Sequence, residues 1–408
     1  MPSTSTMTRG MDWTAVAVVV ISGFVACLQV GKGAIATPWV QAAFRIDLGA
    51  AGWLTAAIAA LGLAGGIPAG AIVARIGDRR CLMFGLGTIF VGAVLGAAAP
   101  SFPVLVASRV VEGLGFLLVT VAGPAVLQRV TEPRHLNASL ALWSCVMPAG
   151  MAAAMLAGSA AGDWRTLWWG GAALAAIAGI MTGMVVTGSG TGEAPSWSGL
   201  GRDAALTLRR RGPALLAACF ALYALMFFAL FSFLPILLME RMAVAASVAG
   251  PLSALAVGVN LVGNLAAGYL LSRGVGRSAL IAGASLVMGL CALGIFLPLL
   301  GTGPVFLLCL LFSAIGGLIP ATLLSSAPLL APSGHLVAMV VGLMMQGSNL
   351  GQLVGPVAVG GVIGAYGWPA AAGAVGVAAA LAIVAALALG AAFRRRATRS
   401  IAPSDVVS

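Results

Sequence analysis

Three ionisable side chains lie well inside long apolar stretches of the sequence: Lys32, Arg109 and Glu112. A charged group is costly in a nonpolar environment, so one that occurs there is usually functional. Glu112 is the only acid well inside any of these stretches, which makes it the candidate proton-coupling residue. Arg109 and Glu112 share one helical face because they are three residues apart. Two cations against one carboxylate favour an anionic solute bound by Lys32 and Arg109.

More ordinary roles stay open for these charges. Arg109 and Glu112 could form a purely structural ion pair within one helix, which would make both charges tolerable in lipid. Lys32 could instead extend its flexible side chain to the nearer membrane surface.

Uncharged polar residues at helical spacing form a second set of candidates. An amide that faced lipid would lose its hydrogen bonds, so we expect these groups to face the protein interior. There they could bind the solute or hold helices together. Tyr223 precedes an aromatic run that could line a cavity, although packing or lipid contact is the more ordinary role. The candidate substrate-binding residues of this set are Gln29, Tyr223, Asn260, Asn264, Gln346, Asn349 and Gln352.

The elements that must position these residues are membrane-spanning helices. Of the 408 residues, 61% are hydrophobic and 8% are charged, whereas a soluble domain carries about 25% charged residues. The apolar runs do not alternate and are far longer than the roughly 10 residues of a barrel strand. A helix needs about 20 residues to cross the hydrocarbon. The sequence therefore predicts an all-α membrane protein with twelve spans, at 13–38, 52–74, 81–99, 103–128, 136–161, 166–187, 214–239, 245–271, 278–299, 303–329, 335–362 and 368–392.

Glycine and proline inside two of these spans, 136–161 and 335–362, indicate that both bend. The basic residues predict the orientation. The net charge is +11, yet Lys and Arg fall almost wholly in short gaps between apolar runs, which excludes a nucleic-acid partner and is typical of membrane topology. With an internal amino terminus, only Arg45, Arg165 and Arg241 fall in external loops. We expect both termini to lie in the cytoplasm of a bacterial cell, with the chain in the inner membrane.

The second half of the sequence repeats the first. Residues 70–75 match 268–273, because each segment begins with Gly and ends with Arg. Residues 109–113 align with 313–317 at an offset of 204. Two parallel halves with a site between them are the architecture of a rocking, alternating-access carrier. The predicted organisation is a six-helix bundle over 1–187, a cytoplasmic linker loop over 188–213, a second six-helix bundle over 214–393 and a basic tail over 394–408.

These motifs resemble those of the major facilitator superfamily over essentially the whole chain. The family's loop signature, Gly-x-x-x-Asp-Arg-x-Gly-Arg followed by Arg or Lys, is matched by residues 70–80. Ala74 replaces the signature acid, which in the family helps to hold the inward-closed state, and Asp78 is the nearby acid that could replace it. The fourth-span signature Arg-x-x-x-Gly is intact at 109–113, whereas the fifth-span signature is reduced to Met-Pro-Ala-Gly at 147–150.

The resemblance implies the twelve-helix, two-bundle fold of that family, with spans one and four lining a central cavity. It also implies a set of residues that control the gate between conformations: Gly70, Arg75, Gly77, Asp78, Arg79, Arg80, Pro148, Gly150, Arg273, Gly355 and Pro356.

The function that these features favour is secondary active transport of a small anionic solute, coupled to protons or working by exchange. The alternative is proton-driven efflux of amphiphilic drugs, which the fourth-span signature favours and the reduced fifth-span signature opposes. An enzyme is not expected, because the spans lack a nucleophile, a paired acid and base, or metal ligands. The expected partners are the solute, protons and the lipid bilayer, with a monomeric chain and no cofactor or metal.

Overall fold

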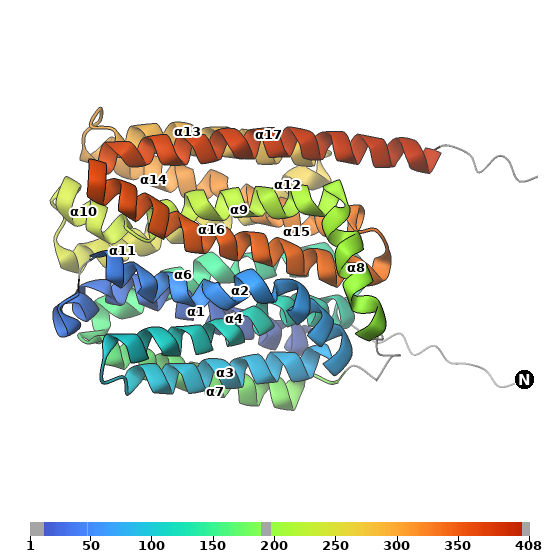
Figure 1. The fold of residues 1–408 in the computed structure, drawn as a ribbon, viewed down its shortest axis with the longest axis horizontal. Coiled ribbons are helices and arrows are strands. Elements are labelled where there is room, and N and C mark those ends of the chain that lie inside the picture. Colours follow the sequence, from blue (N-terminus) through green and yellow to red (C-terminus); the bar gives the residue numbers. More distant parts are fainter. Residues whose placement is uncertain (1–11, 47, 189–196, 402–408) are drawn as a thin grey trace, which may run out of the picture.

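The computed structural model describes residues 12–46, 48–188 and 197–401, and every regular element within them is helical. Figure 1 shows the helices lying side by side, those of the first half (blue to green) next to those of the second half (yellow to red). The first half contains α1 (Trp13–Phe44), α2 (Leu48–Ile76), α3 (Asp78–Ala97), α4 (Phe102–Val130), α5 (Leu136–Ser144), α6 (Val146–Ala161) and α7 (Trp164–Val185).

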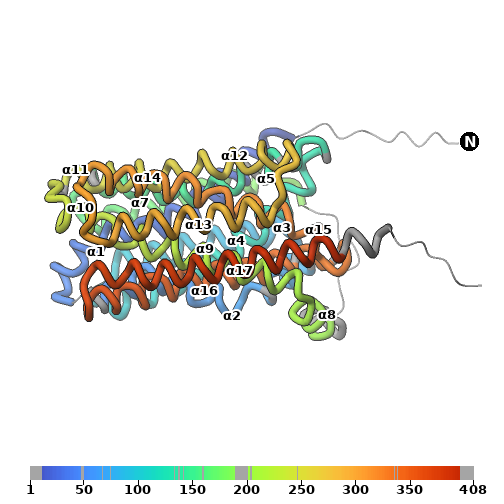
Figure 2. Tube along the Cα trace, turned by 90° about the horizontal axis from the view of Figure 1, so that it is seen from above, coloured from blue at the N-terminus to red at the C-terminus, as the bar shows by residue number. Residues whose placement is uncertain are grey.

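The second half follows a connecting helix, α8 (Trp197–Arg209). It contains α9 (Arg211–Phe231), α10 (Leu234–Met242), α11 (Ala246–Gly258), α12 (Asn260–Ser272), α13 (Arg277–Phe296), α14 (Thr302–Gly316), α15 (Leu318–Leu330), α16 (Val337–Tyr366) and α17 (Trp368–Ile401). Figures 1 and 2 show α8 and the last turns of α17 at the same end of the molecule, which we call the terminal end.

Each predicted span corresponds to one helix or to two consecutive helices. Among the described residues, ten stretches are long and apolar enough to cross a membrane by length and composition. The two predicted spans outside those ten are the 29-residue α2 and the 30-residue α16. Helix α16 carries the polar residues Gln346, Asn349 and Gln352, which lower its hydropathy. Counted with these two, the helices fill all twelve predicted positions.

Several of the predicted spans are divided into two helices. The span 136–161 does break, at Cys145 between α5 and α6, but α16 runs on as one helix with Pro356 inside it. Three other spans, 214–239, 245–271 and 303–329, are each divided into two helices. In the first of them, Pro235 occupies the first turn of α10, where its missing N–H costs no helical hydrogen bond.

The linker between the halves was predicted to be a loop, and this was wrong for residues 197–209, which form α8. This segment is rich in Ala, Leu and Arg and contains no Pro, so local helix propensity exceeds the loop signal of the Gly- and Ser-rich residues before it. Part of the predicted linker, 189–196, lies outside the described residues.

Helix α16 holds the two halves together through two different faces. On its own half it packs against α9, where a Cβ added at Gly355 would lie 2.7 Å from the Leu225 carbonyl oxygen. Gly347 and Gly351 approach the α9 backbone in the same way. Toward the first half it packs against α2, where Gln346 donates hydrogen bonds to the carbonyl oxygens of Leu63 (3.1 Å) and Ala64 (3.3 Å). Contacts between α6 and α11 form another junction between the halves.

Candidate functional site

The three intramembrane charges form one cluster in the interior of the first half. Lys32 Nζ on α1 lies 2.7 Å from Glu112 Oε1 on α4, and Arg109 Nη1 donates to Glu112 Oε2. All three side chains are 0% exposed. The cluster therefore contains two cations and one carboxylate, completely shielded from solvent in this conformation.

Arg109 also cross-links three helices. Its Nε donates to the Leu54 carbonyl oxygen of α2 at 3.0 Å, and its Nη2 donates to the Gln29 carbonyl oxygen of α1 at 2.6 Å. Because the five donors of a guanidinium need partners when buried, these bonds make the position of Arg109 specific. Arg109 and Glu112 are therefore more than a pair within one helix.

Trp168 of α7 completes the cluster. Lys32 Nζ lies 4.6 Å from the centroid of this ring, and Arg109 Cζ lies 5.6 Å from it. A desolvated cation over an indole gains about 2 kcal/mol. Sequence reasoning missed Trp168, since tryptophan near a span end is typical of the membrane interface and gives no sign that it faces a buried charge.

The structure contradicts the alternative in which Lys32 reaches the membrane surface, because its side chain is fully buried and points to Glu112. It also places the cluster differently from the expectation that Lys32 and Arg109 line the central cavity. Both point into the first bundle, toward α7, and neither contributes to the cavity wall. The physical reason is that Glu112, Trp168 and backbone carbonyls within the bundle offer these cations partners that an apolar cavity does not.

The central cavity lies between the two halves and has a volume of about 90 Å³. Of the described residues, those that line it carry no charge. Its wall is mostly aromatic and aliphatic, with a few amide and hydroxyl groups. The first half contributes Cys27, Phe116, Thr120, Trp143, Ser144, Val146, Met147 and Pro148, and the second half contributes Phe220, Tyr223, Ala224, Phe227, Phe228, Asn260, Pro320, Leu324, Met345, Ser348 and Asn349.

A polar network supports the second-half wall of this cavity. Asn260 Nδ2 donates to the Ser313 carbonyl oxygen at 2.8 Å and lies 3.3 Å from the Tyr223 hydroxyl. Asn264, one turn further along α12, donates to Asn260 Oδ1 at 2.8 Å. Tyr223, Asn260 and Asn349 line the cavity, whereas Asn264 holds Asn260 in place from behind, and solute binding by these residues stays a prediction.

The other predicted amides lie outside the cavity wall. Gln29 is buried on α1, where its Nε2 donates to the Val25 carbonyl oxygen and its Oε1 has no partner among the described residues. Gln346 bridges α16 to α2, as described above. Gln352 is buried on α16, and its Nε2 is likewise without a partner among the described residues.

The loop signature residues gather at the terminal end of the first half. Gly77 has a φ of 97°, a backbone conformation that favours glycine, and it directs the chain into α3. Asp78, the first residue of α3, accepts from Arg129 Nε of α4 at 2.8 Å. Arg79 donates to the Gly183 carbonyl oxygen of α7 at 2.6 Å. Asp78 and Arg79 thus link α3 to α4 and α7 within one half, while Arg75 and Arg80 are exposed and Gly70 is buried.

The remaining gate candidates lie in three places. Pro148 lines the central cavity, and Gly150 lies against α1, where an added Cβ would be 2.7 Å from the Leu28 backbone nitrogen. Gly355 and Pro356 are buried in α16. Arg273 is exposed at the end of α12, with its guanidinium carbon 5.0 Å from the centroid of the Tyr269 ring. Their roles in gating stay predictions.

The sequence is similar to known transporters over most of its length. The family described as Major Facilitator Superfamily matches residues 19–344. The 3-(3-hydroxy-phenyl)propionate transporter of Escherichia coli K12 is 29% identical over 343 residues, which cover 82% of each chain. The galactose-proton symporter of the same organism is 23% identical over 160 residues, and the match spans 38% of this chain and only 34% of the symporter. The chloramphenicol resistance protein of Streptomyces lividans is 36% identical over 137 residues, 32% of this chain and 34% of that protein.

A similar fold occurs in the crystal structure of the human organic anion transporter MFSD10, with a TM-score of 0.75 over 92% of this chain and 99% of that one. At 16% identity this likeness concerns the fold alone. The family match covers most of the sequence, and the helices have the corresponding arrangement. The chain therefore belongs to the major facilitator superfamily, and it is a multi-pass secondary transporter rather than an enzyme.

Proposed function

We propose that this protein moves a small aromatic organic anion across the bacterial inner membrane by alternating access, coupled to protons. The observation that carries the proposal is the pairing of an aromatic cavity between the halves with a buried, positively charged cluster one helical turn away. The predicted cytoplasmic position of the terminal end belongs to the same proposal.

The cavity wall supports an aromatic solute. Phe220, Tyr223, Phe227 and Phe228 of α9 face Trp143 of α5 across the cavity lining. Aromatic rings attract one another in offset or edge-to-face arrangements, so a ring in the solute gains contacts that an aliphatic chain does not. The Escherichia coli relative that aligns with 82% of this chain is a transporter of an aromatic carboxylate, 3-(3-hydroxy-phenyl)propionate.

The buried cluster supports an anionic group on that solute. Phe116 lines the cavity and follows Glu112 by four residues on α4, so the two Cα positions are about 6 Å apart along the helix. Lys32 similarly follows the cavity residue Cys27 by little more than one turn of α1. Because little water screens charges in the interior, the excess cation of the cluster attracts a carboxylate over this distance.

Glu112 supports the coupling to protons. Its carboxylate accepts from both Lys32 and Arg109, and protonation would remove the negative charge that both cations share. The excess positive charge then doubles, so the proton and the anion each strengthen binding of the other. Since Glu112 is fully buried here, proton exchange requires a different conformation, which is the condition for coupling it to the transport cycle.

A second function, proton-driven efflux of an uncharged amphiphile, has a specific observation in its favour. The described residues that line the central cavity are all uncharged, which suits a neutral solute with hydrogen-bonding groups. The chloramphenicol resistance protein of Streptomyces lividans aligns with 32% of this chain. The two functions differ in whether the charge cluster contributes to solute binding.

Transport by the purified protein in proteoliposomes tests the proposal. With an imposed pH gradient, we expect radiolabelled 3-(3-hydroxyphenyl)propionate to accumulate and chloramphenicol not to. Lys32→Gln and Arg109→Gln should each lower the initial rate by about tenfold or more, which corresponds to about 1.4 kcal/mol. The matched control is Arg45→Gln, which removes an exposed cation of the predicted external surface and should keep the wild-type rate.

Glu112→Gln, assayed at an equal amount of folded protein, tests the coupling to protons. It should retain exchange of labelled for unlabelled solute while losing accumulation driven by the pH gradient. Wild-type rates in both Lys32→Gln and Arg109→Gln would contradict the anion proposal. Unchanged dependence on the pH gradient in Glu112→Gln would remove this residue as the proton carrier.

A further inference from the structure

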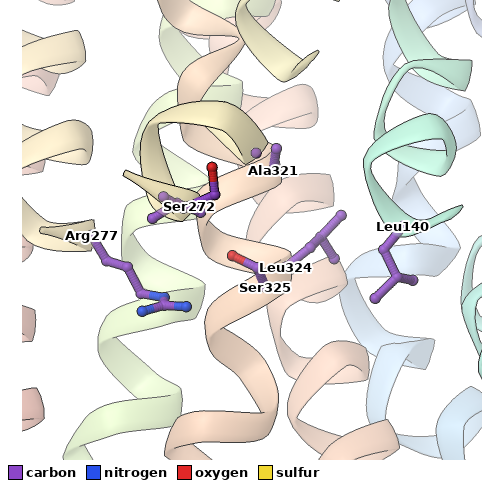
Figure 3. A pocket seen from close by; sticks show the side chains of 8 residues that line it. Leu140, Ser272, Arg277, Ala321, Leu324 and Ser325 are labelled. Atoms are coloured by element: carbon purple, nitrogen blue, oxygen red, sulfur yellow. The ribbon is translucent and has the colours of Figure 1, made fainter. Parts of the chain in front are cut away.

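A second cavity opens between the halves at the terminal end, with a volume of about 260 Å³. Its wall combines Leu140 from α5 of the first half with residues of α12, α13 and α15 from the second half, among them Ser272, Arg277, Leu324 and Ser325. Figure 3 shows the Arg277 guanidinium and the Ser325 hydroxyl on facing sides of the same space. Seven of the eight lining residues belong to the second half, and Leu140 of the first half completes the wall.

Arg277 is the feature of this cavity that calls for a ligand. Its Nε is buried and has no hydrogen-bond partner among the described residues. Arg277 as a whole is only partly buried, but a buried N–H of this kind is normally satisfied, most effectively by a carboxylate or phosphate. The residues that line the cavity include no acid that could provide that partner.

The first half shows what a paired residue at the equivalent position looks like. At the offset of 198 that aligns 70–75 with 268–273, Arg277 corresponds to Arg79. The Nε atoms of both arginines are buried without a partner among the described residues, but Arg79 Nη2 donates to the Gly183 carbonyl oxygen of its own half at 2.6 Å. No such bond to a described residue ties Arg277 Nε, which is therefore available to a ligand.

The position of the cavity connects it to the solute path. Leu324 lines both this cavity and the central one, so the two cavities are neighbours at this side chain. At the opposite end, another cavity of about 260 Å³, lined by Thr37, Trp39 and Met239 among others, shares no lining residue with the central cavity.

We propose that Arg277, with the hydroxyls of Ser272 and Ser325, forms a binding site for an oxyanion, either a carboxylate or a phosphate group. A guanidinium binds such groups through paired N–H donors. Each serine hydroxyl donates to a carbonyl of its own helix, Ser272 to Tyr269 at 2.7 Å and Ser325 to Thr322 at 3.0 Å. Because a hydroxyl rotates freely, it can donate to a bound anion instead. This proposal does not depend on which solute binds in the central cavity.

Calorimetric titration of the purified full-length protein with inorganic phosphate, at constant ionic strength, tests this site. Arg277→Gln should weaken phosphate binding by about tenfold or more, and Ser325→Ala should weaken it less. Arg202→Gln is the control, because it removes an exposed cation of α8 at the same end of the molecule and should bind phosphate as the wild type does. A melting temperature for each variant establishes that it is folded, and Arg277→Lys, which keeps the charge, should recover part of the affinity.

The same titration distinguishes the sources of the anion. Tighter binding of a short-chain phosphatidylglycerol than of phosphate would identify a lipid headgroup as the occupant. Equal competition by phosphate and acetate would identify a soluble anion, such as a solute that leaves the central cavity. Wild-type phosphate affinity in folded Arg277→Gln, or no binding of phosphate, acetate and phosphatidylglycerol to the wild type, would overturn the proposal.

Discussion

The two halves of the molecule connect equivalent helices with different chemistry. In the first half, Arg109 of α4 donates to the Leu54 carbonyl oxygen of α2 at 3.0 Å. In the second half, Asn260 of α12 donates to the Ser313 carbonyl oxygen of α14 at 2.8 Å. Ser313 occupies the position equivalent to Arg109, at the offset of 204. A cation thus links α4 to α2, and an amide links α12 to α14. The donor lies on α4 in the first half, whereas in the second half α14, the helix equivalent to α4, provides the acceptor.

This difference shows that the helix–helix link common to both halves does not depend on the charged groups found only in the first half. A buried side chain joins the two helices in either half, which the shared motion of both halves requires. Only the first half adds a carboxylate and a second cation to that link. Protonation of Glu112 therefore changes the charge of the first half alone. The second-half residues that line the central cavity stay uncharged.

Among the substitutions that test this comparison, the largest loss of stability is expected at Glu112. Glu112→Ala leaves Lys32 and Arg109 buried without a counterion, and breaking a buried pair in this way costs about 3–5 kcal/mol. Lys32→Gln leaves the Arg109–Glu112 pair intact and should cost much less. Thermal unfolding of both variants in detergent measures the difference. Equal melting temperatures would mean that the cluster is not a single electrostatic unit.

An intermediate effect is expected where the halves are alike. Gly113 of α4 lies against the Ile58 carbonyl oxygen of α2, and Gly317, its equivalent in the second half, lies against the Asn260 carbonyl oxygen. Neither site has room for a methyl group, so Gly113→Ala and Gly317→Ala should each cost about 1–3 kcal/mol.

Gly87 of α3 is the control for this pair, because a Cβ added there meets nothing within 4 Å. Gly87→Ala should be neutral or stabilise the helix by up to about 1 kcal/mol. Thermal unfolding again provides the measurement. A large loss of stability from only one of the variants Gly113→Ala and Gly317→Ala would contradict the structural equivalence of the two halves.

The smallest effect is expected in the second half, at Asn260. Asn260→Ala removes side-chain hydrogen bonds to Ser313, Tyr223 and Asn264, each of a kind worth about 0.6 kcal/mol on average within membrane proteins. Because Asn260 also lines the central cavity, we expect the KM for transport to rise. Asn264→Ala serves as the comparison, since Asn264 supports Asn260 from outside the cavity wall. It should lower the melting temperature and change KM less. The reverse order would place Asn264, not Asn260, in contact with the solute.

Much of the fold could be predicted because the signals for it are local. Apolar runs give the position of each span, and the rarity of charge within them identifies Lys32, Arg109 and Glu112. The shared face of Arg109 and Glu112 follows from helical geometry, and the structure pairs the two side chains.

The orientation of side chains toward the cavity could not be predicted in the same way. Helix α9 is apolar on all sides, so no polar stripe marks the face that meets another helix. Whether Trp168 faces a buried cation and Trp143 a cavity depends on helices distant in sequence. The same holds for Lys32, whose partner Glu112 is 80 residues away.

The two faces of α16 have a consequence for the speed of the transport cycle. Gly347, Gly351 and Gly355 bring α16 to the backbone of α9, so these two helices move as one body. The face toward α2 is also closely packed, since a Cβ added at Gly66 would lie 2.4 Å from the Gly342 carbonyl oxygen, and here the amide of Gln346 adds hydrogen bonds that must be exchanged each time the halves rock. The length and bonding of that amide then set part of the activation barrier of the conformational step. Turnover could thus be tuned by natural variation or by engineering at position 346, with the cavity and its solute preference left unchanged.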